Sequence, residues 1–347
     1  MITPKNILIA RTDRIGDVVL SLPLAGIVKK HFPDCRVSFL VRNYTKDLVE
    51  NHPHINEVIL LEEKNGKVPI IRNVKQIRKK SFDAGVIVYP TLVMSLILFL
   101  SQIKIRIGSG YRWYSFLFNK RIFEHRKYAE KHELEFNVNL LKALGIEETI
   151  TIENVKYELR VNEKSLERVK NILNEQGADL QKNIILVHPE SGGSSVDLPI
   201  TKFTSLVKNL SLDNDVVIIL TGSKDDIESC NSVAFDSKVT NFAGRLDLSE
   251  LIALISLCDI FISNSTGPIH IAAALGKKVI GFYPKIPVNS KERWGPYTKN
   301  KVVFEPEIEC SNCTREQCEK MDCMNSINID NVKMEIEKFL ERNKIEK

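Results

Sequence analysis

The sequence lacks a large charge excess of either sign, since 49 lysines and arginines stand against 44 aspartates and glutamates, a net charge of +5. This excess falls short of the basic surface of a nucleic-acid-binding protein, so we expect no nucleic-acid partner. It suits a phosphate-bearing ligand or an anionic membrane surface. Hydrophobic residues make up 43% of the chain, which excludes global disorder.

Uninterrupted apolar runs long enough to cross a membrane are also missing. The nearest candidate, Ala84–Leu100, is broken by Pro90 and contains Ser95, whereas a spanning helix needs about 20 predominantly apolar residues. We predict instead a buried strand over 84–89 followed by a buried helix over 91–101. The amino terminus leads directly into a strand-like run and predicts no signal peptide, so we expect a cytoplasmic protein.

Several common site motifs are absent. Gly108-Ser109-Gly110 is followed by Tyr111-Arg112-Trp113, so the G-x-G-x-x-G fingerprint of dinucleotide-binding folds fails. No Walker loop, His-Glu-x-x-His helix or G-x-S-x-G elbow is present.

Short apolar runs alternate with longer amphipathic stretches, which indicates βαβ units and parallel sheets. The predicted strands are Asn6–Ala10, Arg36–Val41, Glu57–Leu61, Ala84–Tyr89, Lys104–Ile107, Asn183–His188, Asp215–Thr221, Val239–Phe242, Asp259–Ser263 and Lys278–Tyr283. The predicted helices are Val18–His31, Ile70–Lys80, Lys131–Leu144, Thr201–Leu210, Lys224–Phe235, Ser249–Leu257, Pro268–Leu275 and Asp330–Lys344. Pro23 is expected to kink the first of these helices.

Polar sequence over 154–170 lacks a strong sheet pattern and is predicted to connect two domains. We therefore expect an α/β protein with two Rossmann-like lobes facing each other across a cleft. The predicted boundaries are 1–160 for the first domain, 161–329 for the second and 330–347 for a carboxyl-terminal helix.

The most informative motif is Asn264-Ser265-Thr266-Gly267-Pro268, which links a buried strand to a short helix. Proline is favoured at the start of a helix, Ser265 and Thr266 can cap it, and Gly267 lets a ligand approach the backbone. The free N–H groups of such a helix end suit a diphosphate. The alternative is an ordinary capped helix. His270, one turn further on, is either a buried core residue or part of this site.

The first predicted strand ends in Arg11-Thr12-Asp13-Arg14-Ile15-Gly16-Asp17, at the edge where doubly wound sheets bind ligands. Gly16 allows a tight turn. Asp17 lies at a helix start, where the dipole favours the ionised form that a general base needs. Asp17 is alternatively a plain helix cap.

Two further loops follow strands of the second half. His188-Pro189-Glu190-Ser191-Gly192-Gly193-Ser194-Ser195 suits backbone contacts to phosphate or ribose, and Ser191 is our candidate there. Thr221-Gly222-Ser223-Lys224-Asp225-Asp226 offers Asp226 to ribose hydroxyl groups. Each loop alone could be a simple connector, but both are expected at the same sheet edge as Thr266.

Together, Ile-Gly-Asp after the first strand, a mid-chain His-Pro loop and Asn-Ser-Thr-Gly-Pro-x-His-x-Ala-Ala-Ala-Leu resemble glycosyltransferase family 9. This is the family of lipopolysaccharide heptosyltransferases, which use ADP-heptose and have the GT-B fold. The likeness extends from Ile7 to about Ile327. It implies that Asp17 is the general base and that the donor diphosphate lies at Thr266–Gly267.

The resemblance also matches His270 to the family's histidine in the same motif and Asp226 to an acidic residue near the donor ribose, and it implies catalysis without a metal ion. Ser191 and Ser265 complete the predicted donor site. Two positions depart from the family's pattern. Val196 stands where a family lysine is expected, and Ser265 stands where an aspartate is usual. Both changes concern the donor side and leave the identity of the sugar nucleotide open.

The acceptor is predicted to be a lipid-linked saccharide, held by Arg14, Arg112 and Arg121. The last two belong to a basic and aromatic loop, 111–126, which is alternatively a partly buried loop with a solvated rim. Because such an acceptor is anchored in a membrane, we also predict peripheral contact with the inner face of the cytoplasmic membrane.

Three cysteines, Cys35, Cys230 and Cys258, lie in apolar segments and are predicted to be buried. The other four form the cluster Cys310, Cys313, Cys318 and Cys323, whose spacing allows structural zinc. The resemblance favours reduced thiols or a local disulfide, in a structural role. The predicted function is an inverting glycosyltransferase. The alternatives are a transferase or epimerase acting on another nucleotide sugar, and a catalytically silent sugar-nucleotide-binding protein.

Overall fold

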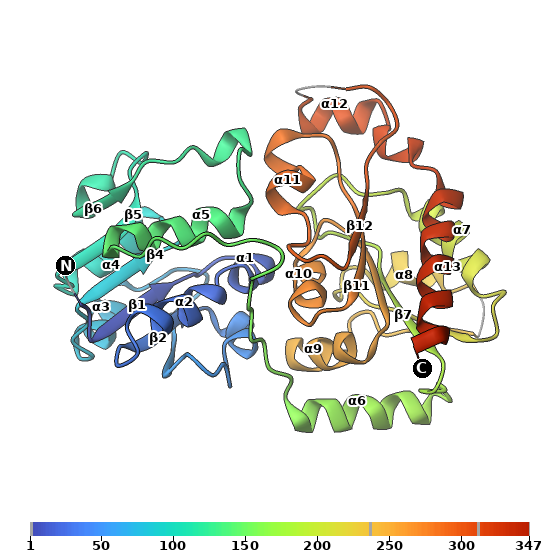
Figure 1. Cartoon of the computed structure of the whole chain (residues 1–347), viewed down its shortest axis with the longest axis horizontal. Helices are drawn as coiled ribbons and strands as arrows, with labels where there is room; N and C mark the ends of the chain where they lie inside the picture. Colours follow the sequence, from blue (N-terminus) through green and yellow to red (C-terminus); the bar gives the residue numbers. More distant parts are fainter. Residues whose placement is uncertain (1–2, 236–237, 311–312, 347) are drawn as a thin grey trace. The chain divides into compact units, whose positions relative to one another are not determined.

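The structure is a computed structural model that describes residues 3–235, 238–310 and 313–346. The chain divides between Arg160 and Val161 into two compact units, called unit 1 and unit 2 below (Figure 1). Lys347, at the end of the predicted carboxyl-terminal region, lies outside the described residues, as do Ser311 and Asn312 of the cysteine segment.

Unit 1 is built on a parallel six-stranded sheet with the order β3-β2-β1-β4-β5-β6. The strands are β1 (Asn6–Ala10), β2 (Arg36–Val41), β3 (Glu57–Leu60), β4 (Ala84–Ile87), β5 (Ile105–Ser109) and β6 (Lys120–Ile122). β1 lies between β2 and β4, with Ile9 opposite Phe39 and Val86. Its continuous apolar sequence reflects burial on both faces.

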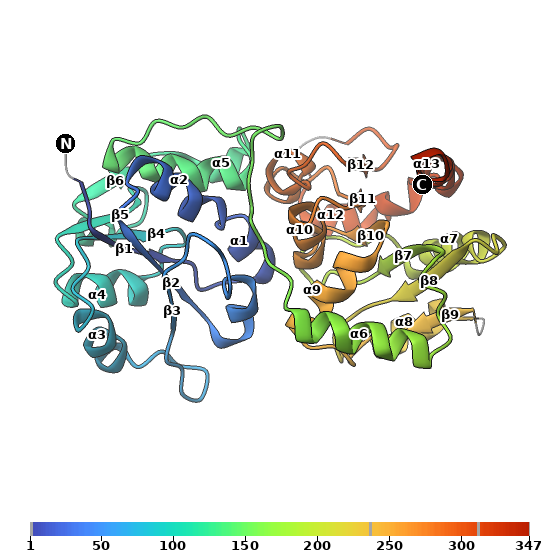
Figure 2. The same ribbon diagram turned by 60° about the horizontal axis from the view of Figure 1, so that its bottom comes forward.

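Helices cover both faces of this sheet (Figure 2). They are α1 (Ile15–Val19), α2 (Pro23–His31), α3 (Ile70–Arg78), α4 (Leu92–Leu100) and α5 (Glu133–Asn139), with short 3-10 segments η1 (Asn43–Leu48), η2 (Ser115–Leu117), η3 (Arg126–Tyr128) and η4 (Leu140–Leu144). The prediction of one kinked helix over 18–31 is wrong. Pro23 is the first residue of α2, where its missing N–H costs no hydrogen bond.

Unit 2 repeats the architecture with the order β12-β11-β10-β7-β8-β9, again all parallel. Its strands are β7 (Asn183–His188), β8 (Val216–Leu220), β9 (Val239–Asn241), β10 (Ile260–Asn264), β11 (Lys278–Phe282) and β12 (Lys301–Phe304). Its helices are α6 (Glu163–Glu175), α7 (Ile200–Leu210), α8 (Ile227–Val233), α9 (Leu248–Leu257), α10 (Gly267–Ala274), α11 (Lys291–Trp294), α12 (Arg315–Lys320) and α13 (Ile329–Glu346), with 3-10 segments η5 (Pro287–Asn289) and η6 (Cys323–Ser326). α13 packs against α7 and adds Val332 and Ile336 to the core of unit 2.

Three further elements differ from the sequence prediction for identifiable reasons. The polar stretch 154–170 is not all connection, because α6 begins at Glu163 after Asn162, whose side chain accepts from Ser165 N. Leu166, Val169 and Leu173 recur in this helix with helical spacing, and Val169 and Leu173 are buried, so the stretch has a helical pattern and not a sheet pattern. Strands β6 and β12 were not predicted; both are edge strands, and no residue of either is fully buried.

The stretch 84–100 forms strand β4 and helix α4, as predicted. Thr91 caps α4 by accepting from Met94 N at 3.2 Å. In the described part of the chain, we find no helix with the length and apolar character needed to cross a bilayer. The α/β prediction is confirmed by the two parallel sheets with their flanking helices.

Candidate active site

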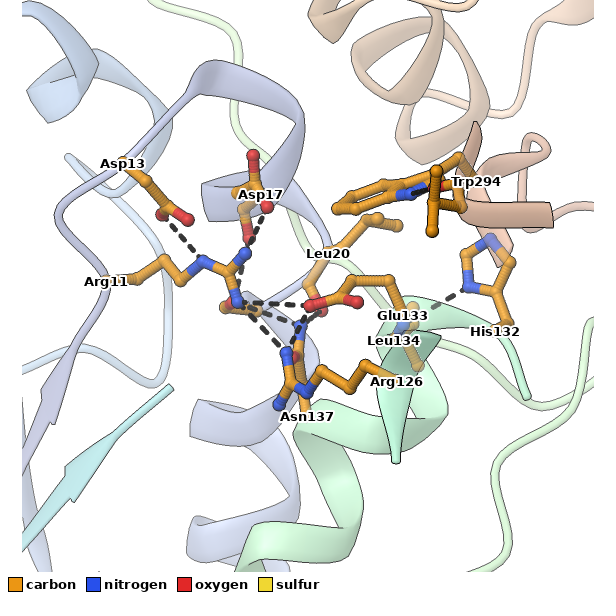
Figure 3. A network of polar contacts seen from close by, with 12 residues as sticks. Arg11, Asp13, Asp17, Leu20, Arg126, His132, Glu133, Leu134, Asn137 and Trp294 are labelled. Atoms are coloured by element: carbon orange, nitrogen blue, oxygen red, sulfur yellow. Dashed lines mark hydrogen bonds and ion pairs between the residues drawn. The ribbon is translucent and has the colours of Figure 1, made fainter. Parts of the chain in front are cut away.

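A buried arginine organises the carboxyl end of strand β1 in unit 1 (Figure 3). Arg11 is only 1% exposed, and its Nε donates to Asp13 Oδ1 at 2.7 Å. One terminal nitrogen donates to Asp17 Oδ1. The other donates to Asn137 Oδ1 at 3.3 Å and lies 3.6 Å from Glu133 Oε1 of helix α5. The guanidinium group therefore joins the loop after β1 to α1 and α5.

The charges in this cluster perturb one another. Burial lowers the pKa of Arg11, but the three surrounding carboxylates outweigh this and raise it, so Arg11 remains cationic. Burial raises the pKa of Asp13 to about 6, repulsion from Asp17 adds to the shift, and Arg11 opposes it. Glu133 also pairs with Arg126. The carboxyl group of Asp13, near the predicted base, therefore has a raised pKa.

A pocket of about 330 Å³ adjoins this cluster within unit 1. Its walls come from residues that follow four neighbouring strands, among them Asp13, Arg14, Arg42 and Tyr89. The hydroxyl of Tyr44, another wall residue, donates to the carbonyl oxygen of Asp13. The combination of aromatic faces with a few charged and hydroxyl groups suits a polar ring such as a sugar.

The structure bears on one of the two interpretations of Asp17, the helix cap. The N-cap of α1 is Arg14, and Asp17 is the third residue of the helix, so the cap interpretation is wrong. Its carboxylate instead accepts from Arg11. Gly16 is a buried residue inside α1 and not a turn residue.

The three arginines predicted to hold the acceptor lie in different places. Arg14 lines the pocket described above. Arg112 is an exposed residue of the loop after β5, and Arg121 is exposed on edge strand β6. Neither belongs to the residues that line the pocket beside Asp13.

In unit 2 the carboxyl ends of β10, β7 and β8 are neighbours, so the three predicted donor loops meet at one sheet edge. Hydrogen bonds join the loop after β7 to the loop after β10. Ser194 Oγ donates to Ser265 O at 3.0 Å. Asn264 Oδ1 accepts from Leu198 N at 2.9 Å, and its amide group donates to Pro189 O. The two loops therefore form one cross-linked structure.

Helix α10 begins at this edge. Thr266 is its N-cap residue with extended backbone, but the Thr266 side chain makes no capping hydrogen bond. Gly267 is the first helical residue and Pro268 the second, one position later than expected. Since no cap side chain occupies the helix start, its first-turn N–H groups suit an anion. His270 is the fourth helical residue and is buried.

The loop after β8 is held by its acidic residue. Asp226 Oδ2 accepts from Ser223 N at 2.6 Å, and a Cβ added at Gly222 would lie 2.9 Å from Asp226 Cβ. On the neighbouring strand, His188 Nδ1 lies 2.9 Å from Thr221 Oγ1. Burial lowers the pKa of His188 to about 4, so its imidazole is neutral at physiological pH.

Two residues that sequence reasoning missed support the loop after β7. Arg315 of α12 donates to Gly193 O at 2.9 Å and to Ser195 O at 3.1 Å. Asp197 Oδ2 accepts from Ser191 N at 3.0 Å, and burial raises the pKa of Asp197 to about 6. Arg315 stands about 120 residues away in sequence, so no local pattern could reveal its contact. Arg11 was also missed as a site residue. It lies two residues before Asp13 in the same motif, so the sequence did contain a signal for it.

The cysteines divide as the sequence suggested. Cys35, Cys230 and Cys258 are buried, which confirms the prediction. In the second group Cys318 and Cys323 are buried in the core of unit 2. Burial raises the pKa of Cys318 to about 12, and Cys323 adds to the shift. Among residues 3–235, 238–310 and 313–346 we find no group of three or more His, Cys, Asp or Glu side chains arranged to hold a metal ion.

Comparison with known proteins gives a consistent result. Residues 70–324 match the family described as glycosyltransferase family 9 (heptosyltransferase). A putative glycosyltransferase of Haemophilus influenzae is 28% identical over 341 residues, which cover 97% of each chain.

Solved structures share the fold over nearly the whole chain. A glycosyl transferase family 9 protein from Veillonella parvula superposes with a TM-score of 0.83 at 18% identity, covering 97% of each chain. The ADP-heptose lps heptosyltransferase II of E. coli gives a TM-score of 0.79 at 19% identity, covering 98% of this chain and 99% of the other. These similarities confirm the predicted two-lobed α/β class of the GT-B type.

Proposed function

Since the chain belongs to glycosyltransferase family 9, we propose that it transfers heptose from ADP-heptose to a lipid-linked saccharide of the lipopolysaccharide-core type. The chain is a glycosyltransferase. The specific donor and acceptor are our proposal, supported by the family and by the shared fold of the E. coli ADP-heptose lps heptosyltransferase II.

The observation that carries the mechanism is the buried ion pair between Arg11 and Asp17. Asp17 removes the proton from an acceptor hydroxyl group as its oxygen attacks the anomeric carbon of the donor. The bond from that carbon to the diphosphate oxygen breaks, and the electron pair leaves with the nucleoside diphosphate. Attack on the face opposite the leaving group inverts the configuration. Arg11 fixes the carboxylate, and the pocket beside Asp13 receives the acceptor sugar.

Unit 2 supplies the donor site in this proposal. Backbone N–H groups at the start of α10, at Thr266–Gly267, bind the diphosphate. They stabilise the negative charge that develops on this group as it leaves. Ser191, Ser265 and His270 complete the site, and Asp226 binds the ribose. Catalysis therefore needs no metal ion, because the helix end supplies the electrostatic stabilisation.

The departures at Val196 and Ser265 leave the phosphate site intact but change the partners of the donor sugar. One removes a cation and the other a carboxylate, so the net charge of the proposed donor site is unaltered. Ser265 both donates and accepts, whereas an aspartate would only accept. Arg14, Arg112 and Arg121 bind the anionic part of the acceptor, and the chain acts at the inner face of the cytoplasmic membrane.

The test is turnover with ADP-heptose against other ADP-, GDP- and UDP-sugars under identical conditions, followed as nucleoside-diphosphate release in the presence of lipid-linked saccharide. We expect ADP-heptose to be preferred and the product to be inverted. Clear preference for another sugar nucleotide would overturn the heptose assignment. Binding of the donor without transfer to any acceptor would overturn the catalytic role.

A further inference from the structure

The segment 99–131 of unit 1 concentrates the positive charge of the protein. It contains eight lysines and arginines and two glutamates, a net charge of +6, while the whole chain carries +5. The rest of the chain is therefore close to neutral. The segment runs from the end of α4 through β5 and edge strand β6 to the loop before α5.

The same segment exposes large apolar side chains. Trp113 is 75% exposed and Phe116 is 65% exposed, and Tyr111, Phe123 and Tyr128 are also on the surface. Exposed apolar groups that gather on one surface of a soluble domain usually mark a binding site. Here they coincide with the positive charge.

Four of the rings form one connected cluster beside β6. The Tyr111 ring stacks on His125 with centroids 3.7 Å apart, and Phe123 meets Tyr111 edge-on at 5.5 Å. Tyr128 lies edge-on to His125 at 5.7 Å. A Cβ added at Gly110 would overlap the Phe123 ring, so this glycine allows the ring to lie against the backbone. The four rings therefore form a packed cluster and do not lie on the surface independently of one another.

A second apolar group adjoins the start of β5. Phe99 and Leu100, at the end of α4, are both exposed. The guanidinium group of Arg106 lies 5.2 Å from the Phe99 ring centroid and donates to Leu117 O at 2.8 Å. Arg106 therefore ties the end of α4 to η2, beside exposed Phe116.

We propose that the surface formed by residues 99–131, called the basic aromatic surface, docks on an anionic phospholipid bilayer. Aromatic side chains favour the membrane interface, and lysines and arginines bind the phosphates of anionic headgroups. Leu100 has no ring face for stacking on a nucleobase, which favours lipid over single-stranded nucleic acid. The inference rests on the proposed function, because a lipid-linked acceptor must be reached at a membrane.

Tryptophan fluorescence can report binding to vesicles, since the chain has two tryptophans, Trp113 and Trp294. In Trp294→Phe the remaining fluorescence comes from Trp113. We expect this variant to sediment with phosphatidylcholine vesicles that contain phosphatidylglycerol and not with vesicles of phosphatidylcholine alone. Emission should shift to the blue, and brominated lipids should quench it. Equal binding to both kinds of vesicle, or no shift, would contradict the proposal.

Substitution of three exposed lysines tests the electrostatic contribution to membrane binding. Replacing Lys104, Lys120 and Lys127 by Gln should weaken binding to the anionic vesicles roughly hundredfold, at about fivefold for each cation near the surface. A matched control replaces Lys164, Lys170 and Lys208, exposed in unit 2, and should bind as the parent does. Equal losses in both triple variants would show only a general charge effect and refute a localised surface.

The apolar part is tested by Trp113→Ser with Phe116→Ser, against Leu212→Ser in unit 2, which is 76% exposed. Only the first should weaken vesicle binding. Donor binding, followed as thermal protection by ADP, should be unchanged in all these variants, so loss of docking is distinguishable from failure of the proposed function. Tighter binding to single-stranded RNA than to anionic vesicles would assign the surface to nucleic acid instead.

Discussion

At the scale of single residues, Asp17 is a carboxylate bound to a buried cation at the end of the central strand β1. Asp17→Asn keeps the size of the side chain but cannot accept a proton. We expect turnover to fall by about 10² to 10⁴, as is typical for loss of a general base. Donor binding should be retained, measured as ADP protection against thermal unfolding.

The matched control is Asp34→Asn, an exposed aspartate of unit 1 that should leave turnover unchanged. Turnover of Asp17→Asn within a few fold of the parent would remove Asp17 from the mechanism.

Asp13 makes a pH-dependent contribution to stability. Because burial raises its pKa from 3.8 to about 6, the folded state holds this proton more tightly than the unfolded state does. The stabilising contribution is therefore largest below about pH 4 and is lost as pH rises to about 6. The loss in the free energy of unfolding is up to about 3 kcal/mol. Asp13→Asn should abolish this decline.

The measurement is the free energy of unfolding of both proteins between acidic and neutral pH. The difference between parent and Asp13→Asn should change across that interval. A constant difference would show that Asp13 titrates normally in the folded protein.

At the scale of elements, α12 supports the loop after β7 through Arg315, which donates to two backbone carbonyl groups. That loop contains Gly192 and Gly193 with φ of 58° and 74°, a left-handed conformation that other residues adopt poorly. Arg315→Ala removes both bonds. We expect the donor KM to rise about tenfold with a smaller effect on kcat.

Lys320→Ala, at the exposed end of the same helix, is the control and should leave the donor KM unchanged. Arg315→Lys should recover little, because an ammonium group cannot bridge two carbonyls as a planar guanidinium does. Full recovery by lysine, or an unchanged KM in Arg315→Ala, would exclude a positioning role for Arg315.

Helix α10 also carries a prediction, because its uncapped amino end is proposed to stabilise the leaving diphosphate. We expect turnover to persist in the presence of a chelator and to be unaffected by added magnesium or manganese. Activity lost to the chelator and restored by either ion would assign the leaving-group stabilisation to a metal.

At the scale of the whole molecule, the division at Arg160–Val161 separates the proposed base from the proposed donor loops. ADP at a hundredfold excess over its Kd should stabilise the site it occupies by about 2.7 kcal/mol. Hydrogen exchange with ADP should slow in 188–195, 221–226 and 264–270. Protection confined to unit 1 would reverse the assignment of the two units.

Much of the architecture was predictable because parallel sheets need long apolar strands buried on both faces. The runs at Asn6–Ala10, Arg36–Val41 and Asn183–His188 were predicted with the boundaries that the structure has. The strands β6 and β12 were not predicted, although the edge strands β3 and β9 were. No residue of β6 or β12 is fully buried, so burial did not impose an apolar run on their sequences.

The sequence by itself determined the two α/β units, the loops at their strand ends and the family, because these follow from local patterns and short motifs. Only the tertiary structure decided what those loops contact. Arg11 meets Glu133 and Asn137 of α5, and Arg315 meets the loop at Gly193, across more than 100 residues of sequence in each case. Such pairs depend on how distant segments pack, and no local pattern encodes that packing. The same holds for the pKa of Asp13, which burial and neighbouring charges set together.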